Sequence, residues 1–311
     1  MAKTTGRTRA RRAARLAAAA VTAALVGTAV PAFAADGNSP VPGWHFGTGK
    51  AKSPLTAAQS GAAAGPQAPV FPLFGVDRSD RGWLYTQNGK GGLTDRGGLW
   101  DGKQVPGLKT GAVVDNDGDN LPDGLWLWDT KGGLHYGGDN NDFLVGGGWN
   151  IYDKVLSPGN LGGGKAGDLL ARDSSGTLWL YLGYGNGKLT SRYKVGGGWG
   201  QYTQIAGNGD LTGDGKPDIV ARDGDGTLWL YKGTGNYKAP FAPRTKIGGG
   251  WNTYNTLVSM GDVDLDGKTD LLARGNDGTL WLYKGTGNAS APYKLRVKIG
   301  TGGWNTYRTL F

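Results

Sequence analysis

The sequence predicts an all-β fold, a closed ring of five four-stranded antiparallel sheets, and three observations support this prediction. A strand with the pattern Trp-Leu-Tyr or a close variant recurs five times, at steps of 44 to 52 residues. The chain holds 60 glycines, and all 25 of its acidic residues are aspartate, so turn formers outnumber good helix formers. The last eight residues repeat a segment from the preceding unit. Units near 50 residues with several strands each are typical of a five-bladed β-propeller.

Residues 1–34 are expected to be a secretory signal peptide. Five arginines between Arg7 and Arg15 precede an apolar run over residues 16–30, and Ala-Phe-Ala at residues 32–34 matches a cleavage site. The run is short and rich in alanine, which disfavours a membrane anchor. We therefore expect a secreted, extracellular protein without membrane insertion.

Removal of this segment changes the charge of the chain. The formal net charge of +9 includes six positive charges and no acid from residues 1–34, so the mature chain carries about +3. No dense basic patch remains, and this argues against a nucleic-acid-binding protein. The chain has no cysteine, so its fold does not depend on disulfides.

The mature chain is expected to contain a leader and one domain. Residues 35–69 are rich in Ala, Gly, Pro and Ser, which predicts a flexible leader. Residues 70–311 predict the propeller. In the last complete unit, the predicted strands are 253–260, 271–274, 279–284 and 293–299, with a hairpin turn at 275–278.

The two ends of the domain complement each other. The first unit starts at its second strand, residues 70–76, and lacks a first strand. The final residues 304–311, WNTYRTLF, match the first-strand segment 251–258, WNTYNTLV. We therefore expect the C-terminal strand to complete the first sheet and close the ring, because closure removes two open sheet edges.

A nine-residue acidic loop follows the first strand in three units. Oxygen-bearing side chains stand at positions one, three, five and nine, and a flexible Gly or Asn stands at position six, which is a ligand spacing for a hard cation, with Ca²⁺ expected outside the cell. The fourth copy, residues 160–168, has one carboxylate and is expected to bind no ion. The ions are expected to be structural, and the alternative is a plain Asp/Gly turn. The candidate ligands are Asp115, Asp117, Asp119, Asp123, Asp210, Thr212, Asp214, Asp218, Asp262, Asp264, Asp266 and Asp270.

A glycine-rich segment that ends in Trp-x-x-Tyr follows the fourth strand of four units, and residues 97–101 are a shorter version. An indole face can stack on a sugar ring, and Asn or backbone amides can bind hydroxyl or acetamido groups. Several weak sites on one ring would act together. The alternative, that each Trp packs at a blade corner, stays open. The candidate carbohydrate-binding residues are Trp149, Asn150, Trp199, Trp251, Asn252, Trp304 and Asn305.

These motifs resemble two known groups of proteins. The acidic loops and the Asp-Leu-Leu-Ala-Arg segments at 168–172 and 270–274 resemble the FG-GAP/VCBS repeats of secreted actinobacterial proteins. The five units and the glycine-rich segment resemble the tachylectin-2-type five-bladed propeller lectins. Over residues 70–311, this resemblance implies a propeller that binds N-acetylated sugars in the seams between blades. Because tachylectin-type repeats are not defined by a calcium loop, the sugar contacts of that group are not carried over.

Catalysis is not expected. The chain has two histidines, His45 in the leader and His135 at a position where other units carry Trp, and its aspartates recur with the repeat, as structural or metal ligands do. We therefore expect a secreted, multivalent, lectin-like protein with structural calcium, whose partners are cell-surface or cell-wall glycans. The alternative is a non-catalytic interaction or targeting subunit that joins other secreted proteins in a larger complex, such as a toxin or adhesin assembly.

Overall fold

The computed structural model describes residues 66–98, 104–138 and 142–311, which all belong to one compact unit. The predicted signal peptide and the leader up to residue 65 lie outside the described residues, as do His45, Trp100 and Asp101. No helix in the described part of the chain is long and apolar enough to cross a membrane.

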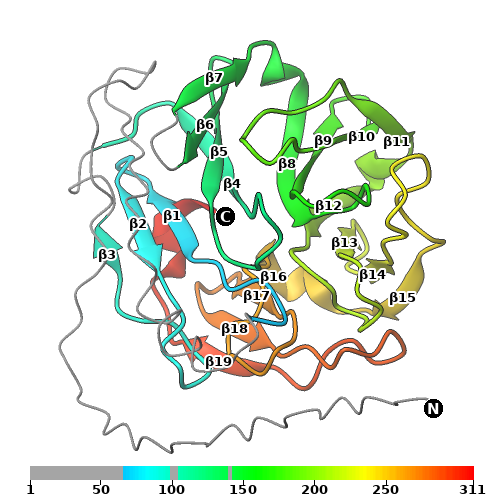
Figure 1. The fold of residues 1–311 in the computed structure, drawn as a ribbon. Helices are drawn as coiled ribbons and strands as arrows, with labels where there is room; N and C mark the ends of the chain where they lie inside the picture. The colour runs from blue at the N-terminus through cyan, green and yellow to red at the C-terminus, as the bar shows by residue number, and fades with distance from the viewer. Residues whose placement is uncertain (1–65, 99–103, 139–141) are drawn as a thin grey trace, which may run out of the picture. The chain divides into compact units, whose positions relative to one another are not determined.

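The described residues form five antiparallel sheets of four strands, which follow one another around a ring (Figure 1). From the innermost strand outwards, blade A contains β20 (Tyr307–Leu310), β1 (Leu73–Asp77), β2 (Gly82–Tyr85) and β3 (Gly97–Gly98). Blade B contains β4 (Leu108–Val114), β5 (Gly124–Asp129), β6 (Leu134–Gly138) and β7 (Phe143–Gly146). Blade C contains β8 (Tyr152–Gly159), β9 (Asp168–Asp173), β10 (Leu178–Tyr181) and β11 (Tyr193–Gly196). Blade D contains β12 (Tyr202–Ala206), β13 (Ile219–Asp223), β14 (Leu228–Tyr231) and β15 (Thr245–Gly248), and blade E contains β16 (Tyr254–Val258), β17 (Leu271–Gly275), β18 (Leu280–Tyr283) and β19 (Val297–Gly300).

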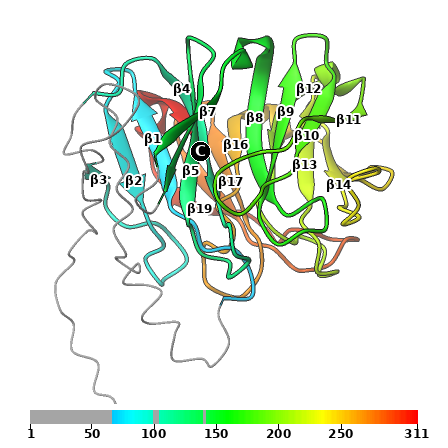
Figure 2. The ribbon, with the colours of Figure 1, turned by 45° about the horizontal axis from the view of Figure 1, so that its top comes forward.

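The predicted five-bladed all-β architecture is therefore confirmed, and the C-terminal strand closes the ring. β20 pairs with β1, with Leu310 opposite Gly75, and lies beside it in both views (Figures 1 and 2). Phe74 and Phe311 exchange two backbone hydrogen bonds of 2.7 and 3.0 Å, and their rings stack with centroids 5.5 Å apart. The vacancy in the first unit is filled by the last residues of the chain.

The recurring Trp-Leu-Tyr strand forms the core between blades. Leu180, Leu230 and Leu282 are fully buried, and each belongs to an apolar cluster that combines residues of neighbouring blades, two for Leu180 and Leu230 and three for Leu282. The flanking Trp and Tyr side chains of these strands are half-buried on the other face. A sheet packed between two others buries both faces, which is why both alternating sets of residues are apolar.

The outermost strand is shorter than the sequence predicts. In blade E it was expected at residues 293–299, whereas β19 runs from Val297 to Gly300. Tyr293 makes only an isolated bridge to Gly285, and the β18–β19 ladder runs between Leu282 opposite Val297 and Leu280 opposite Gly300. A register shift between Leu280 and Trp281 shows that this ladder is irregular as well as short.

Three arginines join consecutive blades. Nη1 of Arg172 donates to the carbonyls of Trp199 and Tyr202, which begin blade D, at 2.9 and 2.5 Å. Arg222 contacts the carbonyls of Trp251 and Tyr254 in the same way, and Arg274 contacts those of Trp304 and Tyr307. The planar guanidinium presents its donors as a fork, so one side chain satisfies two backbone groups of the next blade.

Candidate metal centre and blade seams

The acidic loops join the innermost strand to the second strand in blades B, D and E. In each loop, the first aspartate accepts backbone hydrogen bonds from residues further along the loop. Asp115 accepts from Gly118 at 2.7 Å, and Asp262 accepts from Gly267 at 2.7 Å. These bonds fold nine residues into a compact turn, as Asp side chains do in Asx turns. The first ligand position therefore also shapes the loop.

Two of the loops bring three carboxylates together. One oxygen from each of Asp262, Asp264 and Asp270 lies within 4.8 Å of the others, and the same is true of the set Asp115, Asp117 and Asp123. These are positions one, three and nine of the predicted ligand spacing. The structure therefore assembles most of each candidate cage from the expected residues.

The fifth position does not join these clusters. Oδ1 of Asp119 accepts the backbone N–H of Leu121 at 2.8 Å, and Oδ1 of Asp266 accepts that of Lys268 at 3.1 Å. In blade D, Asp214 bonds Lys216 in the same way at 3.0 Å. These carboxylates cap the end of the turn.

The clustered carboxylates repel one another, and all of them except the exposed Asp117 are at least partly shielded from water. Burial, followed by repulsion from Asp264 and Asp262, raises the pKa of Asp270 to about 7. Burial raises the pKa of Asp262 to about 6, and burial with repulsion from the neighbouring aspartates raises that of Asp123 to about 6. A bound cation would offset this repulsion.

The contacts of the blade E loop favour a site for a divalent cation over a plain Asp/Gly turn. Oδ2 of Asp264 contacts Nζ of Lys284 at 2.8 Å, so one cation already lies against the cluster. Oδ1 of Asp264 is buried and has no hydrogen-bond partner among the described residues. An all-oxygen donor set with an unsatisfied carboxylate oxygen suits Ca²⁺. The ligands it would use are Asp262, Asp264 and Asp270.

The other two loops differ in charge. In blade D, Thr212 replaces a carboxylate, and its backbone N–H donates to Asp218 at 3.0 Å. In blade C, Asn160 takes the place of the first aspartate and accepts from Gly163 at 2.9 Å. Asn160 folds the turn without adding charge. That the blade C loop binds no ion stays a prediction.

The glycine-rich segments form the seams between blades. Each contains a short 3₁₀ turn whose preceding glycine has a φ of 80 to 83°, a conformation that favours glycine, and these turns are η2 (Trp149–Ile151), η3 (Trp199–Gln201), η4 (Trp251–Thr253) and η5 (Trp304–Thr306). The backbone N–H of Trp199 donates to Gly176 in the hairpin of blade C at 2.9 Å, and the other three tryptophans do the same in their blades.

The tryptophan rings of these segments pack inwards. Trp149, Trp199 and Trp251 are only 6 to 7% exposed, and their rings lie 4.6 to 4.8 Å from those of Tyr181, Tyr231 and Tyr283. Trp304 is half-buried and lies 4.8 Å from Tyr85. The alternative that each Trp packs at a blade corner therefore applies to these three buried indoles, whose faces are covered by tyrosine.

The asparagines of the same segments differ from one another. Asn150 and Asn252 are exposed, whereas Asn305 is half-buried, donates to the carbonyl of Asn276 and accepts from Asn255, both at 3.0 Å. In blade D, Gly200 stands at the equivalent position. Two of the three candidate asparagines are therefore open to a ligand.

Sequence reasoning missed a stacked pair at each of four blades. The guanidinium of Arg192 lies 4.0 Å from the ring centroid of Trp179, whose Nε1–H donates to Asp173 at 2.8 Å. The same stacking recurs in three pairs: Arg96 over Trp83, Arg244 over Trp229 and Arg296 over Trp281. An arginine that follows each of these tryptophans by 13 to 15 residues was the available signal. In blade B, His135 takes the place of the Trp and its Nε2 lies 2.9 Å from Asp129.

Comparisons with known proteins agree with the predicted repeat. Residues 210–273, which include two of the acidic loops, match the family model of the FG-GAP-like repeat. No curated protein matches the sequence. Among solved structures, the chain is similar to AofleA from Arthrobotrys oligospora, with 10% identity, a TM-score of 0.44, and coverage of 76% of this chain and 72% of that chain. It is also similar to regucalcin, a calcium-binding protein from Agrobacterium tumefaciens, with 12% identity, a TM-score of 0.39 and coverage of 74% of each chain. At TM-scores below 0.5, these likenesses carry no argument about function.

Proposed function

We propose that this five-bladed propeller with FG-GAP-like repeats is a secreted, lectin-like protein that binds cell-surface or cell-wall glycans at several seams. The observation that carries the proposal is the recurrence of one seam geometry at four places around a closed ring. A repeated surface on a rigid ring suits a repetitive ligand, because weak sites combine through their high effective concentration. In this proposal, residues 1–34 are removed on export and residues 35–69 form a leader to the domain.

The exposed part of each seam supplies the polar contacts. Asn150 and Asn252 present both an amide donor and an acceptor to solvent, and the preceding glycines expose backbone. These groups match the hydroxyl and acetamido groups of N-acetylated sugars. The buried indoles of Trp149 and Trp251 hold the turn that positions the asparagine.

Calcium has a structural role in this proposal. The clustered carboxylates lie in the loops between the first and second strands, whereas the exposed seam asparagines lie in the segments that follow the fourth strand. Asp270 also accepts the backbone N–H of Gly285 at 2.7 Å, which ties the loop to the segment that follows β18. A cation that neutralises the cluster would therefore stabilise both the acidic loop of blade E and the segment that follows β18. Asp210, Thr212, Asp214 and Asp218 in blade D, and Asp119 and Asp266 in the other two loops, stay proposed as ligands. To bind an ion, Asp119, Asp214 and Asp266 would have to leave their backbone hydrogen bonds.

A glycan array tests the proposal, with the mature protein in the presence of calcium. The double variant Asn150→Gly, Asn252→Gly should lose most of the array signal, because it removes two exposed amides. The fold already carries Gly200 at this position in blade D, so both substitutions should be tolerated. Asn186→Gly, an exposed asparagine in the loop between β10 and β11, is the matched control.

The array also separates the two classes of function. A signal that the double variant keeps in full contradicts the seam assignment. A blank array together with a stoichiometric protein partner from culture supernatant favours the targeting-subunit alternative. Trp251→Ala is a poor probe, because it empties a buried site and destabilises the fold whatever the ligand.

A further inference from the structure

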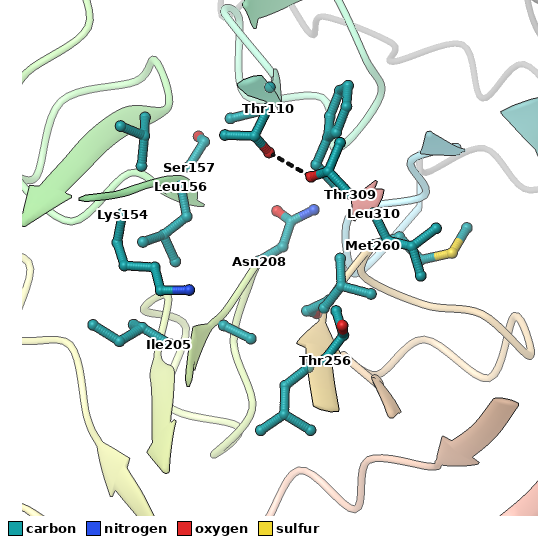
Figure 3. A pocket seen from close by; sticks show the side chains of 18 of the residues that line it. Thr110, Lys154, Leu156, Ser157, Ile205, Asn208, Thr256, Met260, Thr309 and Leu310 are labelled. Carbon is teal, nitrogen blue, oxygen red and sulfur yellow. Dashed lines mark hydrogen bonds between the residues drawn. The ribbon is translucent and has the colours of Figure 1, made fainter. Parts of the chain in front are cut away.

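A cavity of about 410 Å³ lies at the centre of the ring, lined by residues of all five innermost strands, β20, β4, β8, β12 and β16 (Figure 3). None of the clustered carboxylates and none of the seam tryptophans or asparagines proposed above lines it. Its size is in the range of small-molecule sites. The cavity therefore offers a site distinct from the one proposed for glycans.

One layer of the cavity breaks the symmetry of the ring. Thr110, Gln204, Thr256 and Thr309 occupy equivalent positions on four innermost strands, each opposite the corresponding residue of the second strand. On β8 the equivalent residue is Lys154, which pairs with Arg172 in the same register. Lys154 is thus the one charged residue among these five equivalent positions, where the others hold Thr or Gln.

The ammonium of Lys154 has no hydrogen bond or ion pair within residues 66–98, 104–138 and 142–311. Figure 3 shows it directed towards the middle of the cavity. The adjacent carboxylate of Asp153 is engaged by Arg172, with both contacts at 2.8 Å. Burial, followed by repulsion from Arg172, lowers the pKa of Lys154. Asp153, the acidic residue next to Lys154, is thus already paired with Arg172.

The wall as a whole carries excess positive charge. Lys109, Lys154, Arg274 and Arg308 line the cavity, and Asp153 is its one acidic lining residue among those described. Arg308 is paired with Asp80 at 2.8 Å, outside the lining. Lys109 donates to the carbonyl of Tyr152 at 3.1 Å and lies 3.4 Å from the centroid of the Trp128 ring, and neither of these partners carries a formal negative charge. An electropositive, partly enclosed space favours an anion.

Asn208 adds a second polar group to the cavity wall. The residue is 4% exposed, its side chain points into the cavity (Figure 3), and it has no hydrogen-bond partner in the described part of the chain. The apolar side chains of Ile205 and Leu257 also line the cavity.

We propose that the cavity binds a small organic anion, a carboxylate with a short apolar body. The carboxylate contacts the ammonium of Lys154, the body contacts Ile205 and Leu257, and Asn208 binds a second polar group of the ligand. The amide of Asn208 and the ammonium of Lys154 have no protein partner among the described residues and face the cavity, so both can bind a ligand that enters it. The proposal goes beyond glycan binding and does not depend on it.

The test is calorimetric titration of the mature protein with hexanoate, with the neutral hexanamide, and with inorganic phosphate. Lys154→Thr places the residue of three other blades at this position, and Asn208→Met places the equivalent residue of blade E, Met260. Lys246→Thr, an exposed lysine of β15, is the control. We expect hexanoate to bind, Lys154→Thr to weaken its binding at least about tenfold, and the control to bind normally. Hexanoate has no second polar group, so Asn208→Met should leave its binding unchanged and should weaken the binding of 6-hydroxyhexanoate, which carries a terminal hydroxyl.

Several outcomes overturn the proposal. These are an absence of hexanoate binding at millimolar concentration, equal binding of hexanamide, and an unchanged affinity in Lys154→Thr. If phosphate binds more tightly than hexanoate, the proposed contact between an apolar ligand body and the cavity wall is wrong. Loss of fold is not expected to confuse the result, because Lys154→Thr removes an unpaired charge and should melt no lower than the parent without ligand. Its glycan-array signal should equal that of the parent, so failure here leaves the seam proposal intact.

Discussion

Leu310→Ala measures how much the C-terminal strand contributes to the ring. Leu310 is 8% exposed and packs in the apolar cluster that contains Phe74, Val76 and Tyr307. Removing a buried leucine side chain costs about 3 kcal/mol, through lost burial and the cavity that remains. For a domain of this size, we expect the melting temperature to fall by about 6–12 °C. Differential scanning fluorimetry of the mature protein measures the shift.

The control is a leucine that makes no core contact. Leu295 is 93% exposed, so Leu295→Ala should change stability by less than about 0.5 kcal/mol. Tyr307→Phe separates hydrogen bonding from packing, because it removes only the hydroxyl that lies 2.5 Å from that of Tyr85. We expect it to cost about 1 kcal/mol. If Leu310→Ala and Leu295→Ala melt at the same temperature, the strand is not part of the core and the closure argument fails.

Calcium should raise the melting temperature near neutral pH relative to EDTA. Asp264→Asn should remove the part of that gain that comes from blade E, whereas the exposed Asp225→Asn should keep all of it. Equal melting temperatures with calcium and with EDTA would contradict the cage. Without calcium, Asp270 has a pKa of about 7 in the folded protein and an ordinary value of 3.8, so the folded state holds the proton longer. The free energy of unfolding in EDTA should therefore fall as the pH rises from about 4 to about 7 and then level off. Melting temperatures that rise with pH in this window would contradict the raised pKa of Asp270. Arg222→Met leaves two carbonyls of blade E without their donor and should lower the free energy of unfolding in urea by about 2–4 kcal/mol. Arg222→Lys should recover only part of that free energy. A loss of stability smaller than that from substituting an exposed arginine would exclude a role for Arg222 in joining blades.

The fold was predictable because the same strand pattern recurs in every unit. Five copies of one strand pattern set the number of blades, and the match of residues 304–311 to 251–258 predicted the closing strand. The outer strands were less predictable. Residues 293–296 have a strand-like composition, yet the regular ladder includes only residues from Val297 onwards. Whether an edge segment joins its neighbour depends on register, which a single segment does not encode.

The candidate sites were predictable to different degrees. The acidic loops are local, so their spacing alone predicted that Asp262, Asp264 and Asp270 would meet. Asp266 has the same residue type and spacing, but the turn directs it to the backbone of Lys268. The indole of Trp199 could not be judged from its own segment, because the ring that covers it, Tyr231, lies 32 residues further along the chain.

The sequence by itself determined the number of blades, the closing strand and the acidic loops, because each depends on residues near one another or on copies of one pattern. Only the tertiary structure decided which carboxylates converge, which tryptophans are covered, and that Lys154 faces a central cavity. In the sequence, Lys154 is an ordinary lysine in a strand. Its surroundings come from five strands about 50 residues apart, and long-range packing of this kind creates an electrostatic environment that no local pattern contains.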